Sequence, residues 1–185
     1  ILDDFTLSAT PTVPDAYDTI IEAAGGGTDS VFLRASGAAG TGYTLQANLE
    51  NVTLFGNALN YNLTGNALAN VLGGNGGANA LNGLGGADIM VGGAGNDTYY
   101  VDVAGDAVYE DINAAIAATG DRVLASASYT LTAGSGIELL ATTSNSGTTA
   151  GINLTGNEFV NSVVGNAAGN ILNGGGGKDT LTGLG

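Results

Sequence analysis

The chain has 185 residues with no histidine and no cysteine, which excludes a Ser-His-Asp triad, a Cys-His pair, disulfides and the usual zinc sites. Its 17 acidic residues face only three basic ones, and the net charge of −14 argues against nucleic acid and anionic membranes as partners and favours cations. Glycine is frequent, at 33 residues, yet 44% of the chain is hydrophobic, so the chain is not a disordered linker, and no run of about 18 apolar residues predicts a membrane span.

Residues 1–55 form an acidic leader that we expect to be rich in β-strands. "SVFLRAS" (30–36) and "YTLQANLENVTLFG" (43–56) have the apolar and β-branched patterning of strands. These strands are compatible with a continuation of the coil that the next segment predicts.

Residues 56–106 form a first repeat array with a closing turn. Five contiguous nine-residue blocks each begin with glycine: "GNALNYNLT" (56–64), "GNALANVLG" (65–73), "GNGGANALN" (74–82), "GLGGADIMV" (83–91) and "GGAGNDTYY" (92–100). Position 8 is always large and apolar. Position 6 changes along the array, and reads Tyr61, Asn70, Asn79, Asp88 and Asp97.

Residues 107–146 form a second leader, and residues 147–185 a second array that stops inside a block. "RVLASASYTL" (122–131) predicts strands, and "INAAIAA" (112–118) predicts either a short helix or a bulging loop. The second array contains "GTTAGINLT" (147–155), "GNEFVNSVV" (156–164), "GNAAGNILN" (165–173) and "GGGGKDTLT" (174–182). The chain is therefore two copies of a unit of roughly 90 residues, a repeat architecture.

A period of nine fits a six-residue turn followed by a three-residue strand, with two blocks completing one rung of a flattened coil. Successive rungs would stack as parallel strands, and position 8 would point inward. The fold class we expect is all-β: a parallel β-roll, or β-solenoid, built from nine-residue repeats with two per rung. Its interior columns would be Leu63, Leu72, Leu81, Met90, Tyr99, Leu154, Val163, Leu172 and Leu181.

Tight glycine turns aim backbone carbonyls inward, and a carboxylate at position 6 of stacked turns completes a cage of oxygens. Such oxygen-only ligation suits a hard cation with six to eight ligands, namely Ca²⁺. Where position 6 is asparagine the turn carries no charge, so we expect those rungs to be poor in calcium and held by side-chain hydrogen bonds.

"GGAGNDTYY" resembles the glycine-rich nonapeptide GGxGxDxUx of the RTX (repeats-in-toxin) calcium-binding proteins. The resemblance implies a parallel β-roll with Ca²⁺ between turns on the same edge, held by position-6 carboxylates and turn carbonyls. It also implies export by type I secretion and folding on extracellular calcium. The metal ligands expected on this basis are Asp88, Asp97, Asp106, Asp102, Asp179, Gly83, Gly85, Gly92, Ala94 and Asn79, with Asp88 and Asp106 as the most complete pair.

The function we expect is that of a calcium-binding structural module, without catalytic residues, in a large secreted bacterial protein such as an adhesin, a surface-layer protein or a filament. Two alternatives stay open: an accessory module of a secreted protease, lipase or alginate-modifying enzyme, and a glycan-binding β-roll. Expected partners are calcium ions, further copies of the repeat unit or a cell-surface glycan, without nucleic acid or membrane insertion. We expect an extracellular or cell-surface location.

Overall fold

The computed structural model describes residues 6–8, 21–34, 40–56, 58–110, 120–144 and 150–184, and within them every regular element is a β-strand. All strand pairings are parallel. A six-stranded first sheet contains β1 (Thr6–Ser8), β2 (Ser30–Arg34), β4 (Asn51–Phe55), β6 (Val71–Gly73), β8 (Ile89–Val91) and β10 (Ala107–Tyr109). The segment 112–118, for which the sequence left a helix or a loop open, lies outside the described residues.

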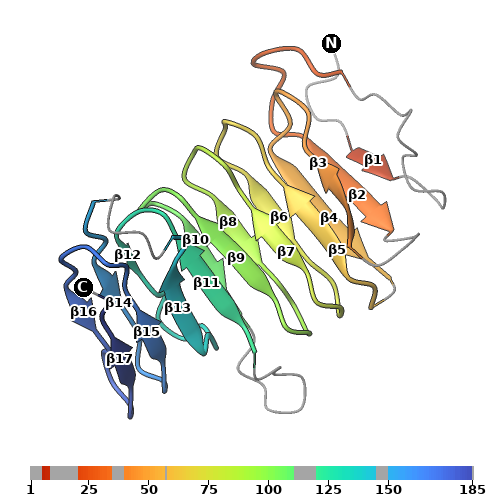
Figure 1. The fold of residues 1–185 in the computed structure, drawn as a ribbon. Helices are drawn as coiled ribbons and strands as arrows, with labels where there is room; N and C mark the ends of the chain where they lie inside the picture. The colour runs from red at the N-terminus through yellow and green to blue at the C-terminus, as the bar shows by residue number, and fades with distance from the viewer. Residues whose placement is uncertain are drawn as a thin grey trace.

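The second sheet has eight strands: β3 (Thr41–Thr44), β5 (Tyr61–Thr64), β7 (Ala80–Asn82), β9 (Thr98–Val101), β11 (Arg122–Ala125), β13 (Leu139–Thr142), β15 (Ser162–Val164) and β17 (Thr180–Thr182). A third sheet supplies the alternate strands of the C-terminal rungs: β12 (Tyr129–Thr130), β14 (Leu154–Thr155) and β16 (Leu172–Asn173). The rungs stack along one axis, from the β1 end to the β16 and β17 end (Figure 1). The predicted all-β parallel roll is confirmed.

The register of the strands confirms that two nine-residue blocks make one rung. In the second sheet Leu63 pairs with Leu81 and Leu81 pairs with Tyr99. In the first sheet Leu72 pairs with Met90. Each step is one position-8 residue onto the next position-8 residue of the same edge, so the glycine period fixes the stacking.

Both leaders continue the same coil. Val31 of β2 pairs with Val52 of β4, and Val52 pairs with Leu72 of the first array. In the second leader Val123 of β11 pairs with Tyr99. The leader rungs keep the inward column of apolar side chains even though they lack the nine-residue glycine period.

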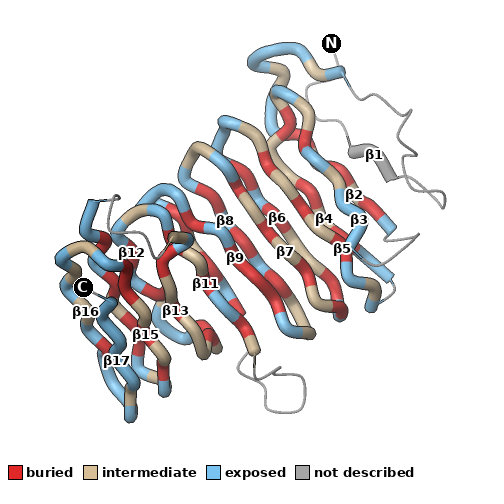
Figure 2. The backbone as a smooth tube through the Cα atoms, viewed as in Figure 1, coloured by how far each residue is buried: buried red, intermediate tan, exposed pale blue. Residues whose placement is uncertain are grey.

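The core is the space between the facing sheets, and burial alternates along strands such as β5, β7 and β8 (Figure 2). Seven of the nine predicted column residues are fully buried: Leu63, Leu72, Leu81, Met90, Tyr99, Leu154 and Val163. Leu172 is only partly buried. The prediction is wrong for Leu181, which is 48% exposed because β17 is paired with one strand, β15, and has no neighbour on its other side.

No helix in the described part of the chain is long and apolar enough to cross a membrane.

Candidate calcium sites along the turns

Position-6 side chains stand directly before the strands, so they form a ladder along each edge of the solenoid. We call the turns that lead into the first sheet the first-sheet turns. There the Asn70 N–H donates to Asp88 Oδ1 at 2.7 Å, and the Asp88 N–H donates to Asp106 Oδ1 at 3.0 Å. Each carboxylate thus binds the backbone of the preceding rung, and Asp88 and Asp106 stand in adjacent turns.

Both carboxylate oxygens of Asp106 accept hydrogen bonds from backbone N–H groups. Its Oδ2 accepts from the N–H groups of Asp102 and Val103, at 3.2 and 3.3 Å, and so closes the turn. Asp102 itself is exposed. The carboxylates of Asp88, Asp102 and Asp106 do not converge within 4.8 Å of one another as a group of three.

The turns that lead into the second sheet, the second-sheet turns, repeat this pattern with residues that the sequence reasoning missed. The Asn79 N–H donates to Asp97 Oδ1 at 2.6 Å, the Asp97 N–H to Asp121 Oδ1 at 2.7 Å, and the Asp121 N–H to Glu138 Oε2 at 2.9 Å. Asp121 and Glu138 belong to the second leader, 24 and then 17 residues apart rather than 18. Counting in nines could not find them.

A local signal could have found both residues. Asp121 stands two positions before the buried Val123, just as Asp97 stands two positions before the buried Tyr99. An acidic residue, one outward residue and one inward apolar residue therefore mark a rung even where the glycines are missing.

Asp88 and Asp97 each keep one buried oxygen, Oδ2, without a hydrogen-bond partner among the described residues. Both side chains are fully buried. A Cβ built on Gly83 would overlap the Asp88 carboxylate, and one on Gly92 would overlap that of Asp97. Position 1 is therefore glycine because the carboxylate of its own block fills the space of a side chain.

The aspartate turns share a distinct backbone conformation, with positive φ at positions 2 and 4. In the block of Asp97 these residues are Gly93 (96°) and Gly95 (117°), and in the block of Asp88 they are Leu84 (63°) and Gly86 (124°). Gly175 (85°) and Gly177 (94°) repeat the pattern in the block of Asp179. Glycine adopts this region readily, whereas Leu84 is strained in it.

Side-chain hydrogen bonds hold the asparagine turns, as predicted, although the buried Nδ2 of Asn75 has no partner among the described residues. The Asn79 Oδ1 accepts from the Asn75 N–H at 2.9 Å, and its Nδ2 donates to the Tyr61 carbonyl of the preceding rung at 2.8 Å. Asn161 does the same with the Asn157 N–H and the Ile137 carbonyl, at 2.9 and 2.7 Å. A carboxylate has no donor to replace the amide group, so only the aspartate turns retain an unused oxygen.

Burial raises the pKa of Asp88, Asp97 and Asp121, and neighbouring carboxylates raise these pKa values further. The pKa of Asp97 is raised to about 7, with Asp121 as the charge that adds to burial. The pKa values of Asp88 and of Asp121 are each raised to about 6. Burial and the charge of Asp106 also raise the pKa of Asp102. A cation bound among these groups would offset the effect.

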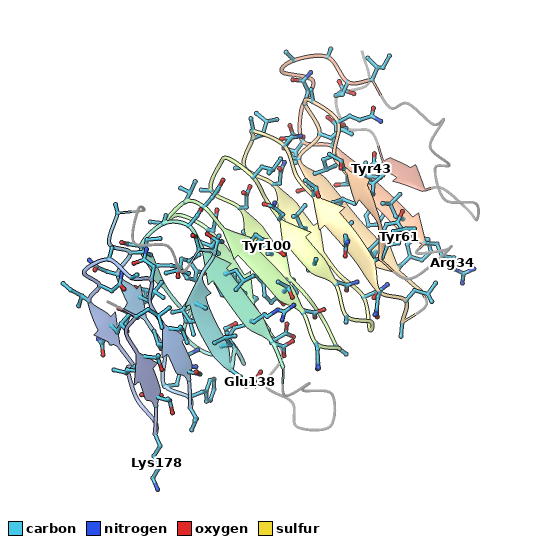
Figure 3. All side chains as sticks on the ribbon, viewed as in Figure 1. Arg34, Tyr43, Tyr61, Tyr100, Glu138 and Lys178 are labelled. Carbon is cyan, nitrogen blue, oxygen red and sulfur yellow. The ribbon has the colours of Figure 1, made fainter. Side chains whose placement is uncertain are left out.

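The basic side chains do not neutralise these turns. Arg34 and Lys178 lie at opposite ends of the solenoid (Figure 3). Arg122 is exposed, and its Nε donates to the Thr98 hydroxyl at 2.9 Å. The −14 charge is thus left for mobile or bound cations to balance.

The remaining expected ligands are distributed as follows. Asp179 is half-buried and its Oδ1 accepts from the Asn161 N–H at 2.9 Å. Gly83 and Gly92 are buried at position 1, while Gly85 and Ala94 are half-buried at position 3. The side chain of Asn79 is engaged as described above, so any ligand from that residue would be its backbone.

One further group of carboxylates converges. Among the described residues, Asp97, Glu110 and Asp121 bring one oxygen each to within 4.8 Å of one another, and all three side chains are buried. Glu110 accepts a hydrogen bond from the Tyr99 hydroxyl. The sequence analysis identified only Asp97 of this group.

Parallel sheets and stacked glycine turns define a parallel β-solenoid, and carboxylates are buried in its turns. A family model described as the RTX calcium-binding nonapeptide repeat (4 copies) matches residues 64–100 and 155–185. The match falls within both arrays, and the resemblance seen in the sequence is confirmed for these two stretches. Comparisons with curated proteins and with solved structures gave no match.

The family implies Ca²⁺ as the ion. The residues present fit it, because the orphaned buried oxygens of Asp88 and Asp97 are hard donors that lack a proton donor.

Proposed function

We propose that the chain is a structural module of a secreted bacterial protein, and that Ca²⁺ bound in its aspartate turns locks the solenoid. The observation that carries the proposal is the pair of orphaned oxygens on Asp88 and Asp97, each fully buried in a turn. A buried acceptor without a partner costs about 1–3 kcal/mol. A bound cation removes that cost.

The ligands we propose follow the two edges. In the first-sheet turns they are Asp88, Asp106 and the carbonyls of Gly83 and Gly85, with Asp102 from the exposed closing turn. In the second-sheet turns they are Asp97 with the carbonyls of Gly92, Ala94 and Asn79, and Asp179 in the second array. When bound, the ion supplies positive charge between carboxylates that otherwise repel, and the residues of the chain hold it in place.

The proposed host is an adhesin, a surface-layer protein or a filament, located outside the cell. The continuous coil supports a spacing or display role, since the leaders extend the solenoid instead of forming separate domains. The recurrence of one unit of roughly 90 residues supports the same role. We propose no catalytic activity.

Calcium-linked folding tests the proposal. Circular dichroism of the chelator-treated chain should show β-structure increasing as Ca²⁺ is added, and chelation should lower the melting temperature. Mg²⁺ should substitute poorly because it requires near-octahedral geometry at shorter distances. The proposed function would be refuted if the chelator-treated chain bound no added calcium and had the same melting temperature with and without calcium.

A further inference from the structure

Glu110 occupies the place of a position-1 glycine where the first array meets the second leader. It follows β10 as Gly92 follows β8, and the pairing of Tyr109 with Val91 stacks Glu110 on Gly92. Every block of the two arrays begins with glycine, and in the blocks with asparagine or aspartate at position 6 that side chain fills the space that a Cβ on the glycine would need. At this rung the chain places a third carboxylate there instead.

The three carboxylates converge through hydrogen bonds that fix each of them. The Asp97 N–H donates to Asp121 Oδ1 at 2.7 Å, and the Tyr99 hydroxyl donates to Glu110. One oxygen of each acid lies within 4.8 Å of the others, a spacing that a single ion can bridge. The exposed fractions are 0% for Asp97, 8% for Glu110 and 1% for Asp121, so bulk water does not screen their repulsion.

An independent observation points to a ligand. Asp97 Oδ1 accepts a hydrogen bond from the Asn79 N–H, whereas Asp97 Oδ2 is buried without a partner among the described residues. A Cβ on Gly92 would overlap both this Oδ2 and the Tyr99 hydroxyl oxygen. The two oxygens therefore lie on the same side of Gly92, and Oδ2 is directed toward the Tyr99 and Glu110 pair.

We propose that Glu110 and Asp121 join Asp97 in its Ca²⁺ site, which therefore has three buried carboxylates and differs from the other turn sites of the repeats. Glu110 and Asp121 lie outside the residues that match the nonapeptide family, and Glu110 places a charged side chain where the repeats have glycine. All three carboxylates of this site are buried and converge, whereas Asp102 of the Asp88 and Asp106 site is exposed and does not join such a group, so the site of Asp97 should be the tightest on the chain. The inference rests on the proposed calcium-binding function.

Isothermal titration of the full chelator-treated chain with Ca²⁺ alone tests the site. Glu110→Gln keeps the side-chain length and a hydrogen bond to Tyr99 but removes one charge, and the tightest binding step should weaken at least about tenfold. Asp121→Asn, which still accepts from the Asp97 N–H, should weaken the same step. Glu158→Gln is the matched control, because Glu158 is exposed and its recorded contact is the Gly134 N–H at 2.8 Å.

Tb³⁺ gives a second measurement at the same place. Tyr99 touches the site, so excitation of tyrosine should sensitise emission from the bound lanthanide, and Glu110→Gln should reduce that emission more than Glu158→Gln does. Wild-type titration curves for both Glu110→Gln and Asp121→Asn would overturn the site while calcium binding by the chain still supported the proposed function. A wild-type chain that binds no Ca²⁺ would remove both.

Discussion

Replacing Asp88 by asparagine should stabilise the folded chain at low calcium and destabilise it at high calcium. At low calcium the substitution removes a buried charge and a buried oxygen that has no donor. Leaving such an acceptor unsatisfied costs about 1–3 kcal/mol, so Asp88→Asn should raise the free energy of unfolding by about 1–2 kcal/mol. At high calcium the same change removes a ligand, and the variant should be less stable than the wild type.

Linkage between folding and binding sets how steeply the free energy of unfolding depends on calcium. Each bound ion adds about 1.4 kcal/mol of stability for every tenfold rise in free calcium above its dissociation constant. Loss of the ion between Asp88 and Asp106 should therefore lower the slope of unfolding free energy against log calcium by about this amount.

Urea unfolding at a series of buffered calcium concentrations measures both lines, and Glu158→Gln controls for the change in net charge. Parallel lines for Asp88→Asn and the wild type would refute the argument, because they would mean that Asp88 faces no ion.

Three further predictions concern the core, the backbone and pH. Leu81→Ala should lower the free energy of unfolding by about 2–5 kcal/mol, whereas Leu181→Ala at the same repeat position should change it by less than about 1 kcal/mol, because Leu81 is fully buried and Leu181 is 48% exposed. Leu84→Gly should raise the free energy of unfolding by about 1 kcal/mol, since Leu84 has φ 63° where the equivalent Gly93 has φ 96°; an unchanged or lower value in urea melts would show that no strain is stored there. In chelator, stability should fall as pH rises from about 5 to 8, because the folded-state pKa of Asp97, about 7, exceeds its ordinary value of 3.8 and the folded chain holds the extra proton only below that pKa. Saturating Ca²⁺ should flatten or reverse that slope in thermal melts, and a chelated protein that gains stability toward pH 8 would contradict the assignment.

The architecture could be predicted because one strong period determines it. Glycine at position 1 and an apolar residue at position 8 fix the length of the turn and the inward face of the strand, so the pairing of Leu63 with Leu81 follows from the sequence. The exposure of Leu181 did not follow, because position in a repeat specifies the direction of a side chain but not whether a neighbouring strand covers it.

Two of the three carboxylates of the proposed site, Glu110 and Asp121, were not predicted because they lie where the nine-residue period breaks. Asp97 is paired with Asp121 at a separation of 24 residues, and Glu110 stands at a position that the repeats reserve for glycine. The different backbone conformation of the aspartate turns could not be predicted either, because Leu84 has a positive φ that is unusual for leucine. The glycine period alone does not show which residues share a turn at this junction; the pairing of β9 with β11 does.

The order of asparagine and aspartate turns along each array determines where a bound cation would stabilise the solenoid. Within each array the asparagine turns precede the aspartate turns, and the position-6 amide forms hydrogen bonds within the protein, as Asn79 does with Asn75 and Tyr61. The aspartate turns come last, and Asp97 is joined to the second leader through Asp121. If calcium binds as we propose, it acts least within the arrays and most at the joint between one unit of roughly 90 residues and the next. The asparagine rungs would then hold their local structure without calcium, and the ion would decide whether successive units dock into one continuous solenoid.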